Sequence, residues 1–413
     1  MGVFYEQVKE RLIRYAKIDT QSQNGTDRVP TTSKQFDLAI MLRDELIKIG
    51  VSDVWLDEEK CVVYGVLPSN IDGGTPIGYV AHMDTSPDAP SEDIKPQVIE
   101  NYDGGPILLN PAKNIVMSPE DFPNLKMYVG QDLICTDGTT LLGGDDKASI
   151  AAIMTMAEYY TAHPDVKHGT IALAFTPDEE VGGLAKDLDL DRFAAKIAYT
   201  LDGDHLGYYE YETFNASWAT VTIKGLSVHP GTAKGIMINS VDVANEFMSA
   251  LPKYEKPQYT DDREGFFHVL SIQGNCEKTV IQLIARDHDA IQFANRNHYL
   301  EIIAEELNRK YPSETVALDI HEQYRSMREV IDKVPFMVDY LKEAIASCDV
   351  EPISIAFRGG TDGSALSQRG LPCPNLSAGY ENAHGRFEYV PIQSMEKNVE
   401  ILIHLNELYA SRD

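Results

Sequence analysis

The sequence lacks the features that mark disulfide-rich and membrane-spanning proteins. Its five cysteines are scattered, odd in number and without a C-x-x-C pair, so neither a disulfide framework nor a thiolate zinc site is predicted. Reduced, buried thiols of a cytoplasmic protein fit this pattern better. No apolar run reaches the length of a membrane span, and residues 1–19 carry no apolar signal core. We therefore expect a cytoplasmic chain with no membrane partner.

Basic residues are also scarce. The chain has 36 Lys and Arg against 64 Asp and Glu, and its formal net charge at pH 7 is -28. Nucleic acids and anionic membranes are bound through basic patches, so we expect neither as a partner. Internal repeats and low-complexity segments are absent as well. At 413 residues the chain exceeds the usual size of a single hydrophobic core, which predicts two domains.

The periodicity of the apolar residues predicts an α/β protein with an inserted domain. Short apolar strands and amphipathic helices occupy the first half of the chain and resume near its end. Residues 213–322 follow a different order, β-α-β-β-α-β, with helices predicted at 240–251 and 289–310. This is the ferredoxin-like order, and it predicts a compact domain inserted into the first.

An acidic motif follows the apolar run at residues 171–175, which is a predicted buried strand. Pro177 cannot donate to a β-ladder, so the strand should end there and leave Asp178, Glu179 and Glu180 on a loop. Three adjacent carboxylates repel one another unless a cation holds them. A metal site, with one acid as ligand and a neighbour as general base, is one interpretation. A solvated acidic turn is the other, and in so acidic a chain it is the default for this motif alone.

Two further strand ends carry similar side chains. One predicted strand leads into His82 and Asp84, which strand alternation places on the same side of the chain. Another ends in Asp202 and Asp204. His82 by itself would more often be a structural histidine. Because sites in open α/β sheets form at the carboxyl ends of strands, we expect the three strands to bring these side chains to one edge.

An Asp pair begins the apolar helix predicted at residues 148–160. Asp145 and Asp146 stand at a helix N-terminus, where free N–H groups and the dipole favour carboxylates. N-capping would need only one of them, so the second is surplus to that explanation.

The candidates gathered from these segments are histidines and carboxylates without cysteine: His82, Asp145, Glu180, Asp202 and His384. Such a set suits a hydrolytic zinc, manganese or cobalt centre. Two histidines and three carboxylates exceed the needs of one open tetrahedral site. With one carboxylate bridging, they fit two metal ions about 3.5–4 Å apart.

Taken in order, these motifs resemble the M20 family of co-catalytic metallopeptidases along essentially the whole chain. The segments that carry the resemblance are His82–Thr85, Gly143–Ala148, Pro177–Gly182, the Asp202 tip, Ser227–Gly231 and His384–Gly385. Within the family, the Asp137–Lys147 run, Asp202–Asp204 and Arg358–Gly363 are most similar to aminopeptidases that act on tripeptides. The resemblance implies a catalytic domain, residues 1–212 and 323–413, with a central mixed β-sheet flanked by helices. It also implies that residues 213–322 form a ferredoxin-like lid.

The resemblance further implies two divalent ions, zinc in the first place, with cobalt or manganese as alternatives. Asp145 would bridge them, and a cis peptide bond would follow it. His82 and Asp202 would complete the coordination of one ion, and Glu180 and His384 that of the other.

The same resemblance assigns catalytic roles to two further acids. Asp84 would orient His82 from behind. Glu179 would be the general base that deprotonates the bridging water and then protonates the leaving amine.

Four residues are implied to bind a small peptide substrate. His229 would stabilise the tetrahedral oxyanion, Arg286 and Asn295 would hold carboxylate or carbonyl groups, and Arg358 would contact the substrate from the catalytic domain. For the free amine of the substrate, Asp178 and Asp204 are both candidate acceptors. In relatives the lid often dimerises, so a homodimer is expected.

Three functions remain open from the sequence. The first is a two-metal aminopeptidase of tripeptides, and the second is another M20 activity: a dipeptidase, a carboxypeptidase or an N-acyl amino acid amidohydrolase. The third is a non-catalytic binding protein, which is disfavoured because all the implied ligands and both catalytic acids are present. The chain departs from the family pattern in two places: the turn before His384 is one residue longer, and Gly144 replaces an alanine.

Overall fold

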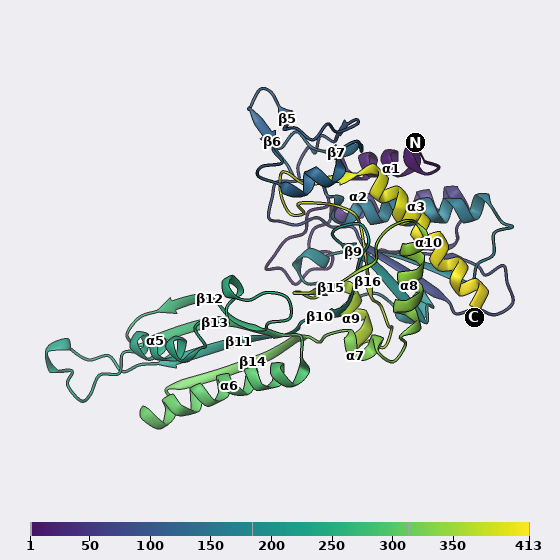
Figure 1. The fold of residues 1–413 in the computed structure, drawn as a ribbon. Helices are drawn as coiled ribbons and strands as arrows, with labels where there is room; N and C mark the ends of the chain where they lie inside the picture. Colours follow the sequence, from purple (N-terminus) through teal and green to yellow (C-terminus); the bar gives the residue numbers. More distant parts are fainter. Residues whose placement is uncertain (1, 184, 313, 413) are drawn as a thin grey trace. The chain divides into compact units, whose positions relative to one another are not determined.

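The structure is a computed structural model that describes residues 2–183, 185–312 and 314–412. The chain forms two compact units (Figure 1). The first comprises Met1–Tyr211, Met327–Ile355 and Thr361–Asp413, and the second comprises Glu212–Ser326 and Ala356–Gly360.

The first unit is built on an eight-stranded sheet with the strand order β1-β2-β8-β3-β9-β16-β10-β15. Strands β8, β3, β9 and β16 run parallel to one another, whereas β1 pairs antiparallel with β2, β2 with β8, and β10 with β16. This arrangement confirms the predicted α/β fold with a central mixed sheet. The strands are β1 (Ser52–Asp57), β2 (Val62–Leu67), β3 (Ile77–His82), β8 (Ile171–Thr176), β9 (Ile197–Gly203), β10 (Tyr208–Thr213), β15 (Ile353–Phe357) and β16 (Asn375–Ser377).

Helices cover both faces of this sheet, which is why its central strands β3, β8 and β9 are buried at nearly every position and do not alternate. Tyr79 and Phe175 point into a core that includes α3, whereas Val80 and Ala174 point into a second core on the opposite face. Helix α3 packs on β3 and β9 and also contacts α1 and α10, while α4 and α9 contact β8 and β9. The helices are α1 (Tyr5–Ala16), α2 (Gln35–Ile49), α3 (Gly144–Ala162), α4 (Leu190–Phe193), α7 (Arg328–Ile331), α8 (Phe336–Ser347), α9 (Asp362–Gln368) and α10 (Ile392–Arg412).

Between β3 and α3 the chain makes a long excursion with only short elements. These are β4 (Gln97–Ile99), β5 (Ile107–Asn110), β6 (Ile115–Met117), the 3-10 helix η1 (Pro123–Tyr128) and β7 (Leu133–Cys135). β7 pairs with β4 on one side and with β17 (Tyr389–Pro391) on the other. The pairing with β17 attaches the segment that follows His384 to the segment that precedes α3.

Element boundaries follow the local signals in most places. β8 ends at Thr176, as Pro177 predicts, and α2 ends at Gly50, whose φ of 88° is the left-handed conformation that glycine tolerates. Lys34 occupies the N-cap position of α2 with helical dihedrals, and no side chain caps the helix.

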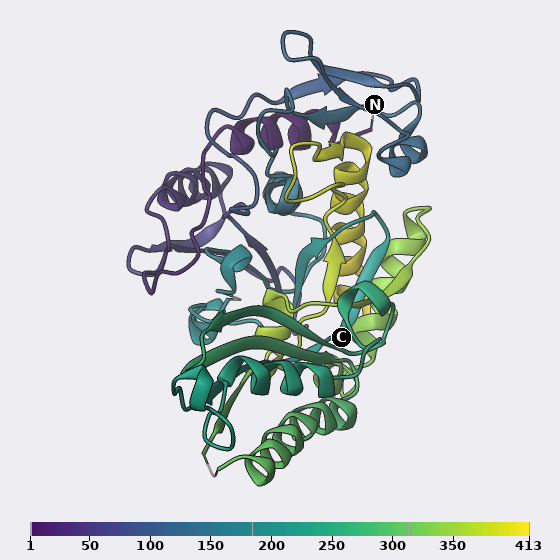
Figure 2. The same cartoon turned by 90° about the vertical axis from the view of Figure 1, so that its left-hand side faces the viewer.

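The second unit has the order β-α-β-β-α-β, as the sequence predicts. Its elements are β11 (Asn215–Lys224), α5 (Ser240–Ala250), β12 (Phe266–Gly274), β13 (Lys278–Asp287), α6 (Ala290–Lys310) and β14 (Val316–Tyr324). The sheet is antiparallel with the strand order β12-β13-β11-β14. Val221 and Leu283 share one core with Phe247 of α5 and Leu300 of α6, so both helices cover the same face of the sheet (Figure 2).

From the sequence we expect free cysteines and no membrane-spanning segment. All five cysteines are free, and four of them are buried; Cys276 is partly exposed. Among the described residues, none of the helices combines the length and the apolar character needed to cross a bilayer.

Candidate metal centre

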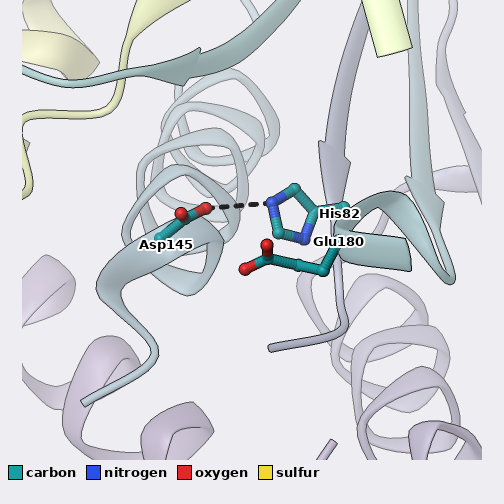
Figure 3. A group of neighbouring side chains, drawn as sticks. All are labelled: His82, Asp145 and Glu180. Carbon is teal, nitrogen blue, oxygen red and sulfur yellow. Dashed lines mark hydrogen bonds and ion pairs between the residues drawn. The ribbon is translucent and has the colours of Figure 1, made fainter. Parts of the chain in front are cut away.

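Asp145 lies between two histidines. Its Oδ1 is 3.0 Å from Nε2 of His82, and its Oδ2 is 3.1 Å from Nε2 of His384. Figure 3 shows the Asp145 carboxylate facing the His82 ring, with Glu180 beside it. Because each carboxylate oxygen faces a different histidine, the group has the geometry of a bridge between two cation sites.

One further carboxylate completes each half. Oδ1 of Asp202 is 3.6 Å from Nε2 of His82, and Oε2 of Glu180 is 2.9 Å from Nε2 of His384. The structure therefore brings together all five side chains predicted as ligands. Glu179 is close as well, since candidate ligand atoms of His82, Glu179 and Asp202 lie within 4.8 Å of one another.

The sheet explains this convergence. β8, β3 and β9 are neighbouring parallel strands, and the last residue of β3, His82, pairs with the last residue of β8, Thr176. Their carboxyl ends therefore reach one edge, as expected. Asp145 arrives at the same place from the first turn of α3, where its dihedrals are non-helical and its peptide bond to Asp146 is cis, as the family resemblance implies.

Asp84 contacts both His82 and the turn that follows β8. It is fully buried, and its Oδ1 is 3.4 Å from Nδ1 of His82, which also lies 3.0 Å from the Asp84 carbonyl oxygen. The other ring nitrogen of His82, Nε2, faces Asp145. The Asp84 carboxylate also accepts the backbone N–H groups of Glu179 (2.9 Å) and Glu180 (3.3 Å), a role that the sequence does not reveal.

The acids here are costly to ionise without a cation. Burial raises the pKa of Glu179 well above its ordinary value, and the neighbouring charge of Asp202 raises it further. Burial and the charge of Asp145 raise the pKa of Glu180 to about 8. Burial likewise raises the pKa of Asp202. A cluster of carboxylates that resist ionisation is the arrangement that bound cations would stabilise.

The histidines and Asp145 take up part of that charge. Burial opposes the charged form of His82, but hydrogen bonds to Asp145 and Asp202 outweigh it and raise its pKa well above the ordinary value. Hydrogen bonds to Asp145 and Glu180 raise the pKa of His384 to about 11. Burial would raise the pKa of Asp145, but the hydrogen bonds from His384 and His82 lower it below its usual range.

The donor set fits a pair of divalent ions. Imidazole nitrogens and carboxylate oxygens without thiolate are typical ligands of zinc, manganese and cobalt. Oε1 of Glu180 is buried and has no hydrogen-bond partner, and a buried carboxylate oxygen without a partner is costly unless a cation satisfies it. The residues present therefore fit the metals that the family resemblance implies.

Glu388 is a supporting residue that the sequence reading missed. It is buried, and its carboxylate accepts the N–H groups of Leu142 (2.8 Å), Gly143 (2.7 Å) and Asp145 (2.9 Å). Glu388 comes just before β17, far along the chain from the turn it holds. No local motif marks it, because its partners are backbone amides.

The two candidate acceptors for a substrate amine differ in their surroundings. Asp178 is buried, and its carboxylate already accepts hydrogen bonds from Thr31 and Gln35. Most of its hydrogen bonds therefore go to the N-terminal part of the chain. Asp204 follows the end of β9, and desolvation of its carboxyl group together with the charge of Asp145 raises its pKa to about 6.

The four residues predicted to bind substrate all belong to the second unit. The prediction that places Arg358 in the catalytic domain is therefore wrong, because residues 356–360 belong to the second unit. His229 is exposed in the loop before the 3-10 helix η3 (Pro230–Thr232), and its Nδ1 accepts the N–H of Gly231 at 3.1 Å. Asn295 is exposed on α6. Arg286, at the end of β13, donates to the carbonyl oxygen of Arg358 at 3.2 Å.

Arg358 is anchored within its own unit. Its guanidinium donates to the carbonyl oxygens of Asp262 (2.7 Å) and Glu264 (3.0 Å) and to Oγ1 of Thr260 (2.8 Å). The structure thus brings Arg286 and Arg358 together, whereas His229 and Asn295 stand on separate segments.

Comparison with known proteins places these observations in a family. The family model described as Peptidase family M20/M25/M40 matches residues 143–407. Peptidase T of Clostridium botulinum (strain Loch Maree / Type A3) is 49% identical over 406 residues, which cover 98% of this chain and 99% of that protein. Peptidase T of Geobacillus thermodenitrificans is 48% identical over 408 residues, with the same coverage.

Solved structures share the fold at lower identity. Aminopeptidase PepT from Bacillus cereus has a TM-score of 0.77 at 21% identity, and a tripeptidase from Staphylococcus aureus has a TM-score of 0.78 at 20% identity. Each alignment covers 99% of both chains. A dinuclear metal-binding M20 peptidase from Bacillus subtilis aligns with a TM-score of 0.67 at 12% identity, over 99% of both chains.

Proposed function

Since this chain belongs to peptidase family M20/M25/M40 and is therefore a peptidase, we propose that it is a two-metal aminopeptidase that removes the N-terminal residue of tripeptides. The observation that carries the two-metal part is the Asp145 carboxylate, whose two oxygens face His82 and His384 separately. The near full-length likeness to proteins named Peptidase T supports the tripeptide part.

We assign the ligands from the side-chain geometry. His82 and Asp202 would hold one ion, Glu180 and His384 the other, and Asp145 both. Zinc is the proposed metal, with cobalt and manganese as alternatives. When bound, the two ions would supply Lewis-acid polarisation of the scissile carbonyl and a lowered pKa of the attacking water.

Glu179 is the proposed general base. Its carboxyl lies in the same group as His82 and Asp202, and burial raises its pKa well above the ordinary value of a glutamate. A carboxylate with a raised pKa can accept a proton from water and later return it to the leaving amine. Asp84 fixes the backbone of this residue through the N–H group of Glu179.

Residues 213–322, which make up most of the second unit, are the proposed lid. His229 would donate to the oxyanion, and Arg286 and Asn295 would hold the carboxylate or carbonyl groups of the peptide. Arg358 would contact the substrate too, although its guanidinium also ties the loop at Thr260. We propose a homodimer formed through this unit and a cytoplasmic location.

The test is hydrolysis of three matched peptides by metal-loaded protein: Ala-Ala, Ala-Ala-Ala and N-acetyl-Ala-Ala-Ala. Release of the N-terminal residue from the free tripeptide alone is the expected result. Preference for the dipeptide or the acetylated peptide would keep the two-metal chemistry and reject the tripeptide assignment. Hydrolysis of none of them by protein that holds two ions would reject the proposal.

A further inference from the structure

Asp178, the residue before the proposed base, is tied to the N-terminal part of the chain. Its Oδ1 accepts the Thr31 N–H (3.0 Å), the Thr31 hydroxyl (2.5 Å) and the side-chain amide of Gln35 (2.6 Å). Its Oδ2 accepts the Thr31 N–H as well, at 2.8 Å. Thr31 is 147 positions away in the sequence, and Gln35 is fully buried at the start of α2. These hydrogen bonds fix the Asp178 side chain to a separate element of the fold.

The backbone at Asp178 begins a tight turn. Its φ of 62° is left-handed, and the 3-10 helix η2 (Glu179–Val181) follows at once. The carbonyl oxygen of Asp178 accepts the N–H of Gly183 at 2.7 Å. A Cβ on Gly183 would lie only 2.5 Å from that oxygen, so the turn can close this tightly only with glycine.

A second carboxylate holds the same turn from the sheet. Asp84 accepts the N–H groups of Glu179 and Glu180. It holds the backbone of these residues close to the strand ends, but it contacts only their backbone amides. The Asp178 side chain instead ties the start of the turn to Thr31 and Gln35.

We propose that Asp178 is a positioning residue that directs Glu179 and Glu180 into the metal centre. Thr31 and Gln35 supply its anchors, so the loop before α2 controls a catalytic base and a metal ligand at once. This inference rests on the roles that the proposed function gives to those two glutamates. It also explains why a third acid precedes them in a cluster that needs only two.

The expected effect on activity is large because catalysis depends on placement. A displacement of about 1 Å can cost about 100-fold in rate, and removing a partner behind a metal ligand typically costs about 10–100-fold in metal affinity or activity. In Asp178→Asn an amide NH2 replaces one carboxylate oxygen and faces donors on Thr31. We therefore expect kcat to fall about 10–100-fold while KM changes less than about threefold.

The experiment compares Asp178→Asn, Thr31→Val and Gln35→Leu with a matched control, Thr32→Val. Thr32 lies in the same loop and donates its hydroxyl to the Gln21 carbonyl at 2.7 Å, without a contact to Asp178. Two readouts are used: kcat and KM on a tripeptide, and calorimetric titration of metal-free protein with zinc. The three test variants should weaken one of the two metal equivalents and lower kcat, and the control should do neither.

The titration separates this inference from the proposed function, because metal binding does not depend on the substrate. If the wild type prefers a different peptide, kcat is measured on that peptide and the comparison stands. The proposal is overturned if Asp178→Asn binds both equivalents as the wild type does, or if Thr31→Val and Thr32→Val behave alike. Should Asp178→Asn fail to fold, Thr31→Val, Gln35→Leu and the double variant that combines them decide the matter. Losses of kcat and zinc affinity in the double variant that are smaller than the sum of the single losses, expressed as free energies, support a shared anchor. Strict additivity contradicts it.

Discussion

The carboxylate of Glu388 accepts the backbone N–H of Asp145 at 2.9 Å, although the two residues lie 243 positions apart in the sequence. Its other oxygen accepts the N–H groups of Leu142 and Gly143. The turn that presents the proposed bridging ligand is therefore held from a segment beside β17. Burial raises the pKa of Glu388 to about 7, and the amide hydrogen bonds oppose that rise.

Replacing Glu388 should therefore weaken the metal centre. In Glu388→Gln one oxygen becomes an NH2 group that faces amide donors, so the turn must shift, and we expect a loss of about 10–100-fold in metal affinity. Zinc content after dialysis at defined free zinc measures it. Glu396→Gln is the matched control, because Glu396 is also buried and accepts a backbone N–H, that of Phe4 at 3.0 Å. Equal losses of metal affinity in both variants would contradict the prediction, because they would show a general cost of replacing a buried glutamate.

Glu179 and Glu180 are neighbours with different proposed roles, and the same substitution separates them. Glu179→Gln should lower turnover about 100-fold or more while two metal ions still bind, because a base is lost and no ligand is. Glu180→Gln should reduce the bound metal towards one equivalent. Metal analysis and peptide hydrolysis on the same samples provide both readouts. Near-normal turnover in Glu179→Gln would remove it from the role of base.

The sheet edge was predictable because its signals are local. Apolar runs lead into His82 and Asp202 at the ends of β3 and β9, and Pro177 ends β8 shortly before Glu180. Parallel neighbours bring such strand ends together. The strands and helices of the second unit were predictable for the same reason, since each carries its own period.

The partners of the acids were not predictable. Asp178 looked like an amine acceptor, yet its oxygens are taken by Thr31 and Gln35, which no local pattern connects to it. Glu388 has only backbone partners near Asp145, and a backbone amide leaves no mark on composition or spacing. Hydrogen bonds between distant segments depend on the tertiary packing, so they emerge only from the structure.

Metal removal should make the stability of the protein depend on pH. Burial and Asp145 raise the pKa of Glu180 to about 8, and hydrogen bonds raise that of His384 to about 11. Without metal, the folded state then binds more protons than the unfolded state from about pH 5 upward, so the free energy of unfolding falls as the pH rises. We expect the unfolding temperature of chelator-treated protein to be lower at about pH 8.5 than at about pH 6.

Adding zinc back supplies the control for this prediction. The ions bind only the folded state, and two sites at about 100 times their Kd would add about 5 kcal/mol. The zinc-induced rise in unfolding temperature should be greater at the higher pH, where the ligands are ready to ionise. Calorimetry at both pH values with and without zinc measures it. The electrostatic account of the site would be contradicted by two results together. The zinc-induced rise in unfolding temperature would be the same at both pH values, and the unfolding temperature of the metal-free protein would not depend on pH.

Glu210 tests whether a buried acid outside the proposed ligand set limits stability in the same way. It is 4% exposed, and its Oε2 accepts the side-chain amide of Asn375 at 2.7 Å. Burial raises its pKa to about 8, against the opposing hydrogen bond from Asn375. Below about pH 4.5 the carboxyl is neutral in both the folded and the unfolded state and costs no stability, whereas between about pH 4.5 and 8 only the unfolded chain ionises and stability is lost.

Glu210→Gln keeps an acceptor for Asn375 and removes the titration. The unfolding temperature of zinc-loaded Glu210→Gln should therefore be several degrees above that of the wild type at about pH 8 and close to it at about pH 5. An equal difference at both pH values, measured by calorimetry, would assign the effect to packing, because packing does not follow the protonation of a carboxyl group.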